Sequence, residues 1–408
     1  MAAFVGRCIP IKSLSDQEGG LITDVLEAIR VFSIPVDWGP DGLPSKQMQP
    51  VYADRERFNK AEQMVENPKT YYHVTLQEGR EIARAAFNLF DAGTKPNAYL
   101  PHKILTNLAN VVPGSLQGLY LRLLERDFGW GSDALLREAD ATTRDQIIVL
   151  LEKGTEDIYR GTHLLCALAW IGDEVVQARF AQWRRTPPAW SVSLSSPLED
   201  YTYQAGWELT ADGRRRDLCH QENYDLVAAD EAAAAIIPGP EVAMTPNTER
   251  CRWCDRPLFT LFDIDLCDPR MAFLGMVGER LRIVTCPDCA YQMVAYVFTD
   301  VAGDGTAHWS EVNGDPPEGL EVDEEGLSLP SHWYVLGSKR KTPYEGTGSH
   351  LGGYPYWVQW AQYPRCPTCG QTMMCIGQLE PQADYLEGIV YAFLCVPCGK
   401  ATTVYQQT

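Results

Sequence analysis

The sequence predicts an α+β protein in which α-helical hairpins precede a β domain rich in paired cysteines. Three observations support this fold class. Apolar residues recur at helical spacing up to about residue 187. After residue 188, short apolar segments alternate with turns that contain Gly and Pro. Eight of the 13 cysteines form four C-x-x-C pairs, and all four pairs lie after residue 250.

Length and charge limit the classes of function. A chain of 408 residues allows two or three domains, each with its own core. The formal net charge is −19, divided between residues 1–235 (24 basic and 33 acidic, −9) and 236–408 (11 basic and 21 acidic, −10). This charge disfavours binding to a nucleic-acid backbone, which needs clustered Lys and Arg. It is compatible with a basic protein partner.

The first domain, residues 1–235, is predicted to be mainly helical. Residues 155–183 illustrate the pattern: Gly172 is placed to end one helix and Asp173 to cap the next, and Pro187 follows the second helix. Two helices joined by Gly-Asp resemble a HEAT-type hairpin, and two or three such units fit between about 75 and 187. An irregular helical bundle is the alternative.

The second domain, residues 236–408, is predicted to be β structure, with the boundary in the Ala- and Pro-rich stretch 232–246. Short apolar segments at 281–284 and 390–394 lie next to cysteine pairs and are typical of strands. Residues 300–337 contain nine acidic residues and no Lys or Arg, with frequent Gly and Pro, so we expect a long loop there.

The two halves of this second domain align with each other, which indicates an internal duplication. The segment from Cys251 to Ile264 matches that from Cys366 to Leu379, with apolar residues at the same positions. The segment 281–289 likewise matches 390–398.

The spacing of the cysteines predicts two zinc ribbons, each with four cysteine ligands. A C-x-x-C turn directs two thiolates to one ion, and a second such turn completes a tetrahedral site. Four soft thiolate ligands favour zinc, with iron as the main competitor. We expect two structural Zn²⁺ ions per chain, since a closed site has no open position for substrate. The predicted ligand sets are Cys251, Cys254, Cys286 and Cys289, and Cys366, Cys369, Cys395 and Cys398.

Three alternatives for these cysteines stay open. They are unligated buried thiols, metal sites that pair cysteines across the two halves, and a thioredoxin-like redox role for one pair. The five remaining cysteines, at 8, 166, 219, 267 and 375, are expected to be core thiols.

A family resemblance rests on the last part of the chain. The residues Leu-Gly-Gly-Tyr-Pro-Tyr-Trp at 351–357, Cys366-Pro-Thr-Cys369-Gly, and Ile-Gly-Gln-Leu at 376–379 resemble the YwqG-like family of bacterial proteins. They also resemble, more distantly, the eukaryotic programmed cell death protein 2 family. That resemblance implies protein sequestration, because the eukaryotic relatives are similar to chaperones of a basic ribosomal protein. Bacterial proteins of this type also occur among neutralisers of secreted toxins, as immunity proteins.

No catalytic residue is predicted from the sequence. It contains no G-x-S-x-G, H-E-x-x-H or G-x-x-x-x-G-K-[ST] motif, and its seven histidines lack ligand or triad spacing. We therefore expect a non-enzymatic protein with no small-molecule cofactor besides zinc, which binds a basic partner protein. Two alternatives are a zinc-ribbon protein associated with nucleic acid, and an enzyme with a pocket near Trp207, Trp357 and Trp360.

The sequence also bears on localisation. Its longest apolar stretch, 164–172, is much shorter than the ~20 residues of a membrane span. The first residues show no signal-peptide pattern. We therefore expect a cytoplasmic protein that does not enter a membrane.

Overall fold

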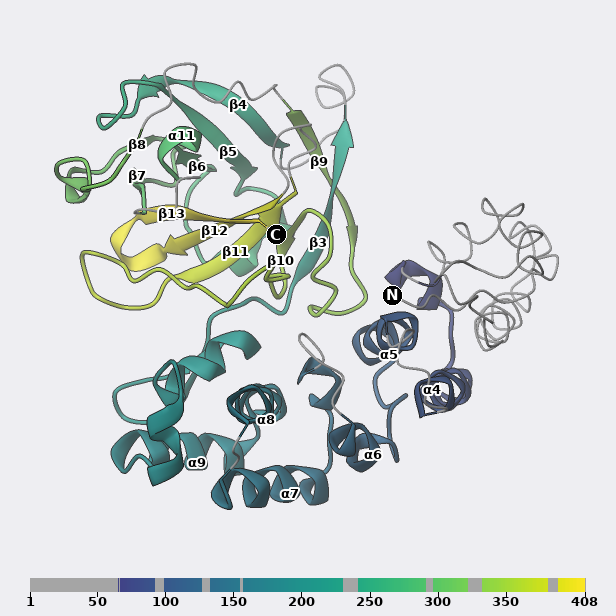
Figure 1. Ribbon diagram of the computed structural model, residues 1–408. Helices are drawn as coiled ribbons and strands as arrows, with labels where there is room; N and C mark the ends of the chain where they lie inside the picture. The colour runs from purple at the N-terminus through teal and green to yellow at the C-terminus, as the bar shows by residue number, and fades with distance from the viewer. Residues whose placement is uncertain are drawn as a thin grey trace, which may run out of the picture. The chain divides into compact units, whose positions relative to one another are not determined.

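The computed structural model describes residues 65, 67–91, 99–126, 133–154, 157–229, 241–290, 296–321, 332–380 and 388–407. The chain forms two compact units. The helical unit comprises Met1–Ala205 and Ala211–Arg214, and the β unit comprises Gly206–Thr210 and Arg215–Thr408 (Figure 1). The predicted mixture of helical and β structure is confirmed.

The described part of the helical unit is a succession of short helices, in which neighbours such as α4 and α5 pack together (Figure 1). Its elements are η2 (Pro68–Tyr71), α4 (Leu76–Asp91), α5 (Tyr99–Val111), α6 (Tyr120–Glu125), η4 (Asp133–Leu136), α7 (Ala141–Glu152), α8 (Ile158–Ile171), α9 (Glu174–Arg185), η5 (Ala189–Ser193) and η6 (Leu198–Ala205).

Local capping sets the boundaries of α8 and α9. The Asp157 carboxylate accepts hydrogen bonds from the N–H groups of Tyr159 and Arg160 at the start of α8. Gly172 ends α8 in the left-handed conformation (φ 54°), which costs glycine least. Asp173 then caps α9 by accepting from Val176 N–H at 2.9 Å. The Gly-Asp junction predicted from the sequence is confirmed.

The core of the helical unit lies around α8. This helix packs against η4, η6 and α7, and six consecutive residues from Leu164 to Ala169 are buried. A helix that is apolar on most of its surface needs neighbours on several sides, which explains its central position.

The β unit contains one extended antiparallel arrangement of strands (Figure 1). In the described residues eleven strands follow the order β6-β5-β4-β9-β3-β10-β11-β12-β13-β7-β8, and β1 and β2 form a separate pair. The first strands are β1 (Trp207–Leu209), β2 (Arg215–Asp217), β3 (Asn223–Ala229), β4 (Glu241–Arg250), β5 (Pro257–Asp265) and β6 (Arg280–Thr285). The others are β7 (Phe298–Val301), β8 (Ala307–Trp309), β9 (His332–Lys339), β10 (His350–Gly352), β11 (Met374–Leu379), β12 (Gly388–Cys395) and β13 (Lys400–Gln407).

The sheet curls so that its two ends approach each other. The edge strand β6 also packs against β7 and β13. The side chains of Thr285 on β6 and Thr403 on β13 share a hydrogen bond of 2.7 Å within the core. Curling in this way encloses one apolar core and protects the edge strand β6.

Two predictions about the β unit need correction. Residues 300–337 do not form one long loop, because they include parts of β7 and β9, all of β8 and the short helix η8 (Glu311–Asn313), while residues 322–331 lie outside the described part. The β unit also begins earlier in the chain than the expected boundary at 235, because β3 pairs with both β9 and β10. Of the expected boundary stretch 232–246, residues 232–240 lie outside the described part and residues 241–246 belong to β4.

A buried ion pair fixes the segment that leads into β10. The side chains of Arg340 and Asp225 are 6% and 8% exposed and lie 2.7 Å apart. The Arg340 guanidinium also donates to the carbonyl groups of Glu345 and Ser349. Gln378 adds hydrogen bonds to two further carbonyl groups of this segment. The Gly-Gly-Tyr-Pro residues therefore follow a loop whose backbone is held from inside the unit.

Replacing Asp225 with Ala is expected to destabilise the β unit strongly. The change leaves the Arg340 charge buried without its partner, which typically costs about 3–5 kcal/mol. The matched control is Lys339→Ala, which removes the exposed ion pair between Lys339 and Glu222 (2.5 Å). An exposed pair is worth only about 0–1 kcal/mol. Urea unfolding followed by tryptophan fluorescence measures both variants, and equal losses of stability would contradict the role given to the buried pair.

Candidate metal centre

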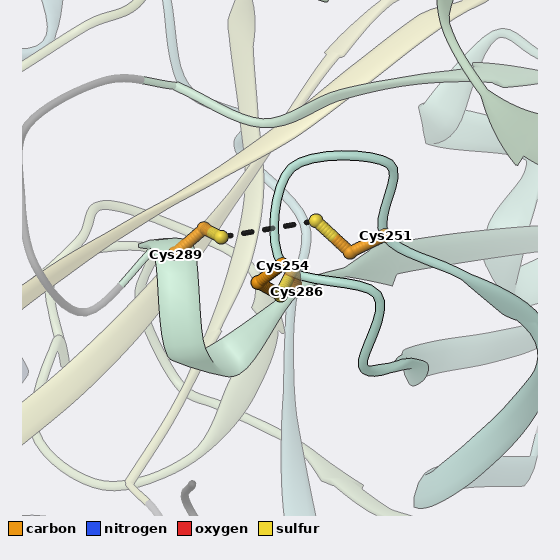
Figure 2. A group of neighbouring side chains, drawn as sticks. All are labelled: Cys251, Cys254, Cys286 and Cys289. Carbon is orange, nitrogen blue, oxygen red and sulfur yellow. Dashed lines mark hydrogen bonds between the residues drawn. The ribbon is translucent and has the colours of Figure 1, made fainter. Parts of the chain in front are cut away.

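The first cysteine quartet brings together the turn before the β5–β6 hairpin and the residues that follow this hairpin (Figure 2). Cys251 and Cys254 lie in the loop between β4 and β5, while Cys286 directly follows β6 and Cys289 lies in the short helix α11 (Pro287–Ala290). The sulfurs of Cys251 and Cys289 are 3.7 Å apart, and those of Cys254 and Cys286 are 3.5 Å apart. All four sulfurs lie within 4.8 Å of one another.

The second quartet is placed in the same way around β11 and β12. Cys366 and Cys369 precede β11, Cys395 is the last residue of β12, and Cys398 ends the short helix η9 (Val396–Cys398). The sulfurs of Cys369 and Cys395 are 3.7 Å apart, and again all four lie within 4.8 Å. The structure therefore brings together all eight predicted ligands, in the two predicted sets.

Each quartet begins with the same tight turn. The Cys251 N–H donates to the carbonyl of Arg256, and the Cys251 carbonyl accepts from the Asp255 N–H, both at 2.8 Å. The turn needs one residue with positive φ, which is Asp255 at 58° in the first quartet and Gly370 at 73° in the second. The equivalent bonds of the second turn, around Cys366, have the same lengths.

An antiparallel hairpin explains how distant pairs meet. In β5 and β6, Phe259 lies opposite Thr285, so the turn before β5 faces the residues after β6. In β11 and β12, Met374 lies opposite Leu394 with the same result. In each hairpin the register shifts between the second and third residue pairs from the cysteines, as at a β-bulge.

The sulfur distances fit a metal ion better than a disulfide. A disulfide needs about 2.05 Å between its sulfurs. A tetrahedral ion with Zn–S bonds of about 2.3 Å has edges of about 3.8 Å between ligands. The observed separations of 3.5–3.7 Å are close to such an edge. With all four sulfurs of each quartet within 4.8 Å of one another, either quartet could hold a metal ion among its four sulfurs.

Charge also favours a cation at each quartet. Contacts with the sulfurs of Cys286 and Cys289 lower the pKa of Cys251, while contacts with Cys251 and Cys289 raise the pKa of Cys286. These opposite directions arise because one thiolate suppresses the ionisation of its neighbours. A bound cation removes this conflict, because it allows all four thiols to ionise.

Backbone amides provide further support for thiolates. Desolvation opposes the ionisation of Cys366, but hydrogen bonds from the N–H groups of Cys369 and Thr368 and contacts with the sulfurs of Cys395 and Cys369 together lower the pKa of Cys366 to about 7. Hydrogen bonds of this kind orient metal ligands and hold them in the required charge state.

The other described cysteines lie outside the quartets. Cys166, Cys219 and Cys375 are buried, as expected, and burial raises the pKa of each. The expectation of a core thiol is wrong for Cys267, which is exposed because it lies in the turn after β5. Cys8 lies outside the described residues.

Other candidate groups are engaged in structural contacts. Arg214, Arg215 and Arg216 pair with different carboxylates, those of Asp212, Asp217 and Glu208. Trp207 is fully buried, and the Trp357 ring packs against Tyr391, Phe393 and Tyr363. These tryptophans therefore have packing roles.

One side-chain pair was not recognised in the sequence. In the helical unit, His163 Nδ1 lies 3.1 Å from the Asp133 carboxylate, across 30 residues of chain. The pair lines a partly open pocket of about 160 Å³, together with apolar residues such as Leu136 and Leu164 and with Arg126 and Arg160. No local spacing signals this pair, because it depends on the packing of η4 against α8.

Comparison with known proteins places the chain in a family. The uncharacterized protein YpfL of Salmonella typhimurium (strain LT2) is 35% identical over 350 residues, which cover 83% of this chain and 79% of the relative. The chain belongs to the YpfL family. No family model matches it. No solved structure matches it either.

Among the described residues of this YpfL-family chain, no helix is long and apolar enough to cross a bilayer.

Replacing Cys286 with Ser in this chain is expected to remove one of the two metal ions that the quartets are expected to bind. The change leaves three thiolates in a buried site, and the ligands of the second hairpin are untouched. The matched control, Cys267→Ser, alters an exposed cysteine outside both quartets and should keep both ions. Elemental analysis of the purified variants measures the difference. Equal metal content in the two variants would contradict the assignment of Cys286 as a ligand.

Proposed function

We propose that both quartets hold structural Zn²⁺. Thiolate ligands favour a soft or borderline ion, and zinc accepts tetrahedral four-sulfur coordination without redox chemistry. The sulfur separations near a zinc tetrahedron's edge support this identity over an unligated thiol cluster. Iron is the competing metal for such a ligand set. A reducing compartment such as the cytoplasm, where we place the protein, keeps such thiols available.

We also propose that the two metal hairpins are copies of one ancestral unit. Their turns have the same hydrogen bonds, and their cysteines occupy equivalent positions around an antiparallel pair of strands. In the helical unit, the helix pairs joined by short turns support the HEAT-like arrangement proposed from the sequence.

The function we propose is non-catalytic binding and sequestration of a basic partner protein. The observation that carries this proposal is the closed geometry of both quartets, since four protein sulfurs leave a metal no position for a substrate. The metal then maintains the shape of the β unit, and the surface performs the function. The net charge of −19 favours a basic partner. The resemblance to YwqG-like proteins supports a chaperone-like or toxin-neutralising immunity role.

A second candidate is an enzymatic or ligand-binding function in the helical unit. The observation that favours it is the His163–Asp133 pair in its cavity, because a carboxylate that orients a histidine is a common feature of general-base catalysis. Nucleic-acid binding ranks below both, since the charge opposes it.

Affinity purification of the tagged chain from its native cells tests the leading proposal. We expect a basic protein in a roughly one-to-one ratio with the chain, released as salt is raised because exposed charges are screened. The Asp225→Ala variant, in which the β unit is weakened, should recover less of it than the Lys339→Ala control. Three results would contradict the proposal: no stoichiometric protein, a partner that is lost on nuclease treatment, or recovery of a small molecule alone.

A further inference from the structure

The two quartets differ in their access to solvent. In the first, Cys251, Cys286 and Cys289 are buried, and Cys254 is partly buried. In the second, Cys369 is exposed and Cys398 is partly exposed, whereas Cys366 and Cys395 are buried. Every residue from 367 to 371 is exposed, so the whole turn of the second quartet projects into solvent.

Contacts from another segment explain the protection of the first turn. Trp253, inside that turn, donates from its indole N–H to the carbonyl of Gly314 at 3.0 Å. Its ring also meets the Trp309 ring edge-on, with centroids 5.3 Å apart. Arg252 pairs with Glu311 at 2.6 Å. The segment 309–314 therefore partly covers Trp253 in the first turn, while Arg252 stays exposed. In the second turn both corresponding positions, Pro367 and Thr368, are exposed.

Oxidation of a cysteine pair takes two steps, and the second step, formation of the disulfide, is equally feasible in both quartets. A disulfide forms when one oxidised sulfur meets a nearby thiolate, and both quartets place sulfurs 3.5–3.7 Å apart. The first step is attack on an oxidant from solution, which requires an exposed thiolate. Only that first step distinguishes the quartets, and it favours Cys369.

We propose that the second quartet is an oxidation site, with Cys369 as the sulfur that reacts with peroxide and Cys395 as the sulfur that resolves it. The Cys369 thiolate attacks hydrogen peroxide, the O–O bond breaks, and a sulfenic acid and hydroxide form. The Cys395 thiolate then attacks the Cys369 sulfur, the S–S bond forms, and a second hydroxide leaves. The two thiolates lose two electrons, and the two hydroxides take protons from solvent to become water.

Oxidation at this site has a local structural consequence. A disulfide between Cys369 and Cys395 removes two of four ligands, so the second quartet loses its metal while the first keeps its own. The turn 366–371 is then linked to the end of β12 by the disulfide alone, and Cys366 and Cys398 lose the ion that they shared. The inference rests on the metal content proposed above, and it makes the β unit responsive to peroxide without affecting the buried quartet.

Stepwise peroxide treatment of the native, metal-loaded chain tests this proposal. A chromogenic chelator in solution reports released metal, and thiol alkylation with peptide mapping identifies the cysteines that are lost. We expect an early phase that releases one of two metal equivalents, with a Cys369–Cys395 disulfide in the peptides. Release of both equivalents in a single phase, or first loss of alkylation at Cys251, Cys254, Cys286 or Cys289, would overturn it.

Two matched variants show which quartet releases its metal in the early phase. Cys369→Ser should abolish the early phase and leave one slowly released metal equivalent. Cys254→Ser changes the equivalent position of the first quartet and should keep the early phase. If a variant does not fold, the peptide map of the native chain decides alone. A native chain without metal would contradict the proposed zinc, and the map would still show whether Cys369 and Cys395 are oxidised first.

Discussion

Four thiolates that meet at one point repel each other unless a cation lies between them, and the β unit contains two such meeting points. Each one joins the turn before a hairpin to the residues that follow it. Structural zinc binding in small domains contributes about 10–16 kcal/mol at neutral pH. That is comparable to the whole stability of a typical domain, about 5–15 kcal/mol. With the zinc content proposed above, the hairpins β5–β6 and β11–β12 are the elements whose stability depends most on the metal.

Strand pairing, a buried ion pair and helix capping hold the remaining parts of the structure. The sheet curls so that β6 reaches β13, which brings the first metal hairpin next to the strand that follows the second. A buried arginine and aspartate hold the loop before β10 from within. In the helical unit, short polar caps at Asp157 and Asp173 define where helices begin, and the apolar helix α8 occupies the centre.

Local features of the sequence predicted local features of the structure. The C-x-x-C pairs led to both quartets, because two thiols separated by two residues need only a tight turn to converge. Gly172 and Asp173 predicted a helix end and a helix start, since both act within one turn of backbone. Contacts between segments far apart in the sequence could not be predicted from local patterns. The position of β3 between β9 and β10, the strands within 300–337 and the contact between Asp133 and His163 all depend on segments far apart in sequence. The unequal exposure of the quartets also depends on a remote segment, which supplies Trp309 and Glu311.

X-ray absorption at the zinc edge, on protein purified without added metal, shows directly whether the quartets bind zinc through four sulfurs. We expect a zinc signal with four sulfur neighbours at about 2.3 Å and no nitrogen or oxygen ligand. Because both quartets have the same donor set, one average environment should describe the whole signal. A spectrum dominated by nitrogen and oxygen neighbours, or a native chain that contains neither zinc nor iron, would contradict it.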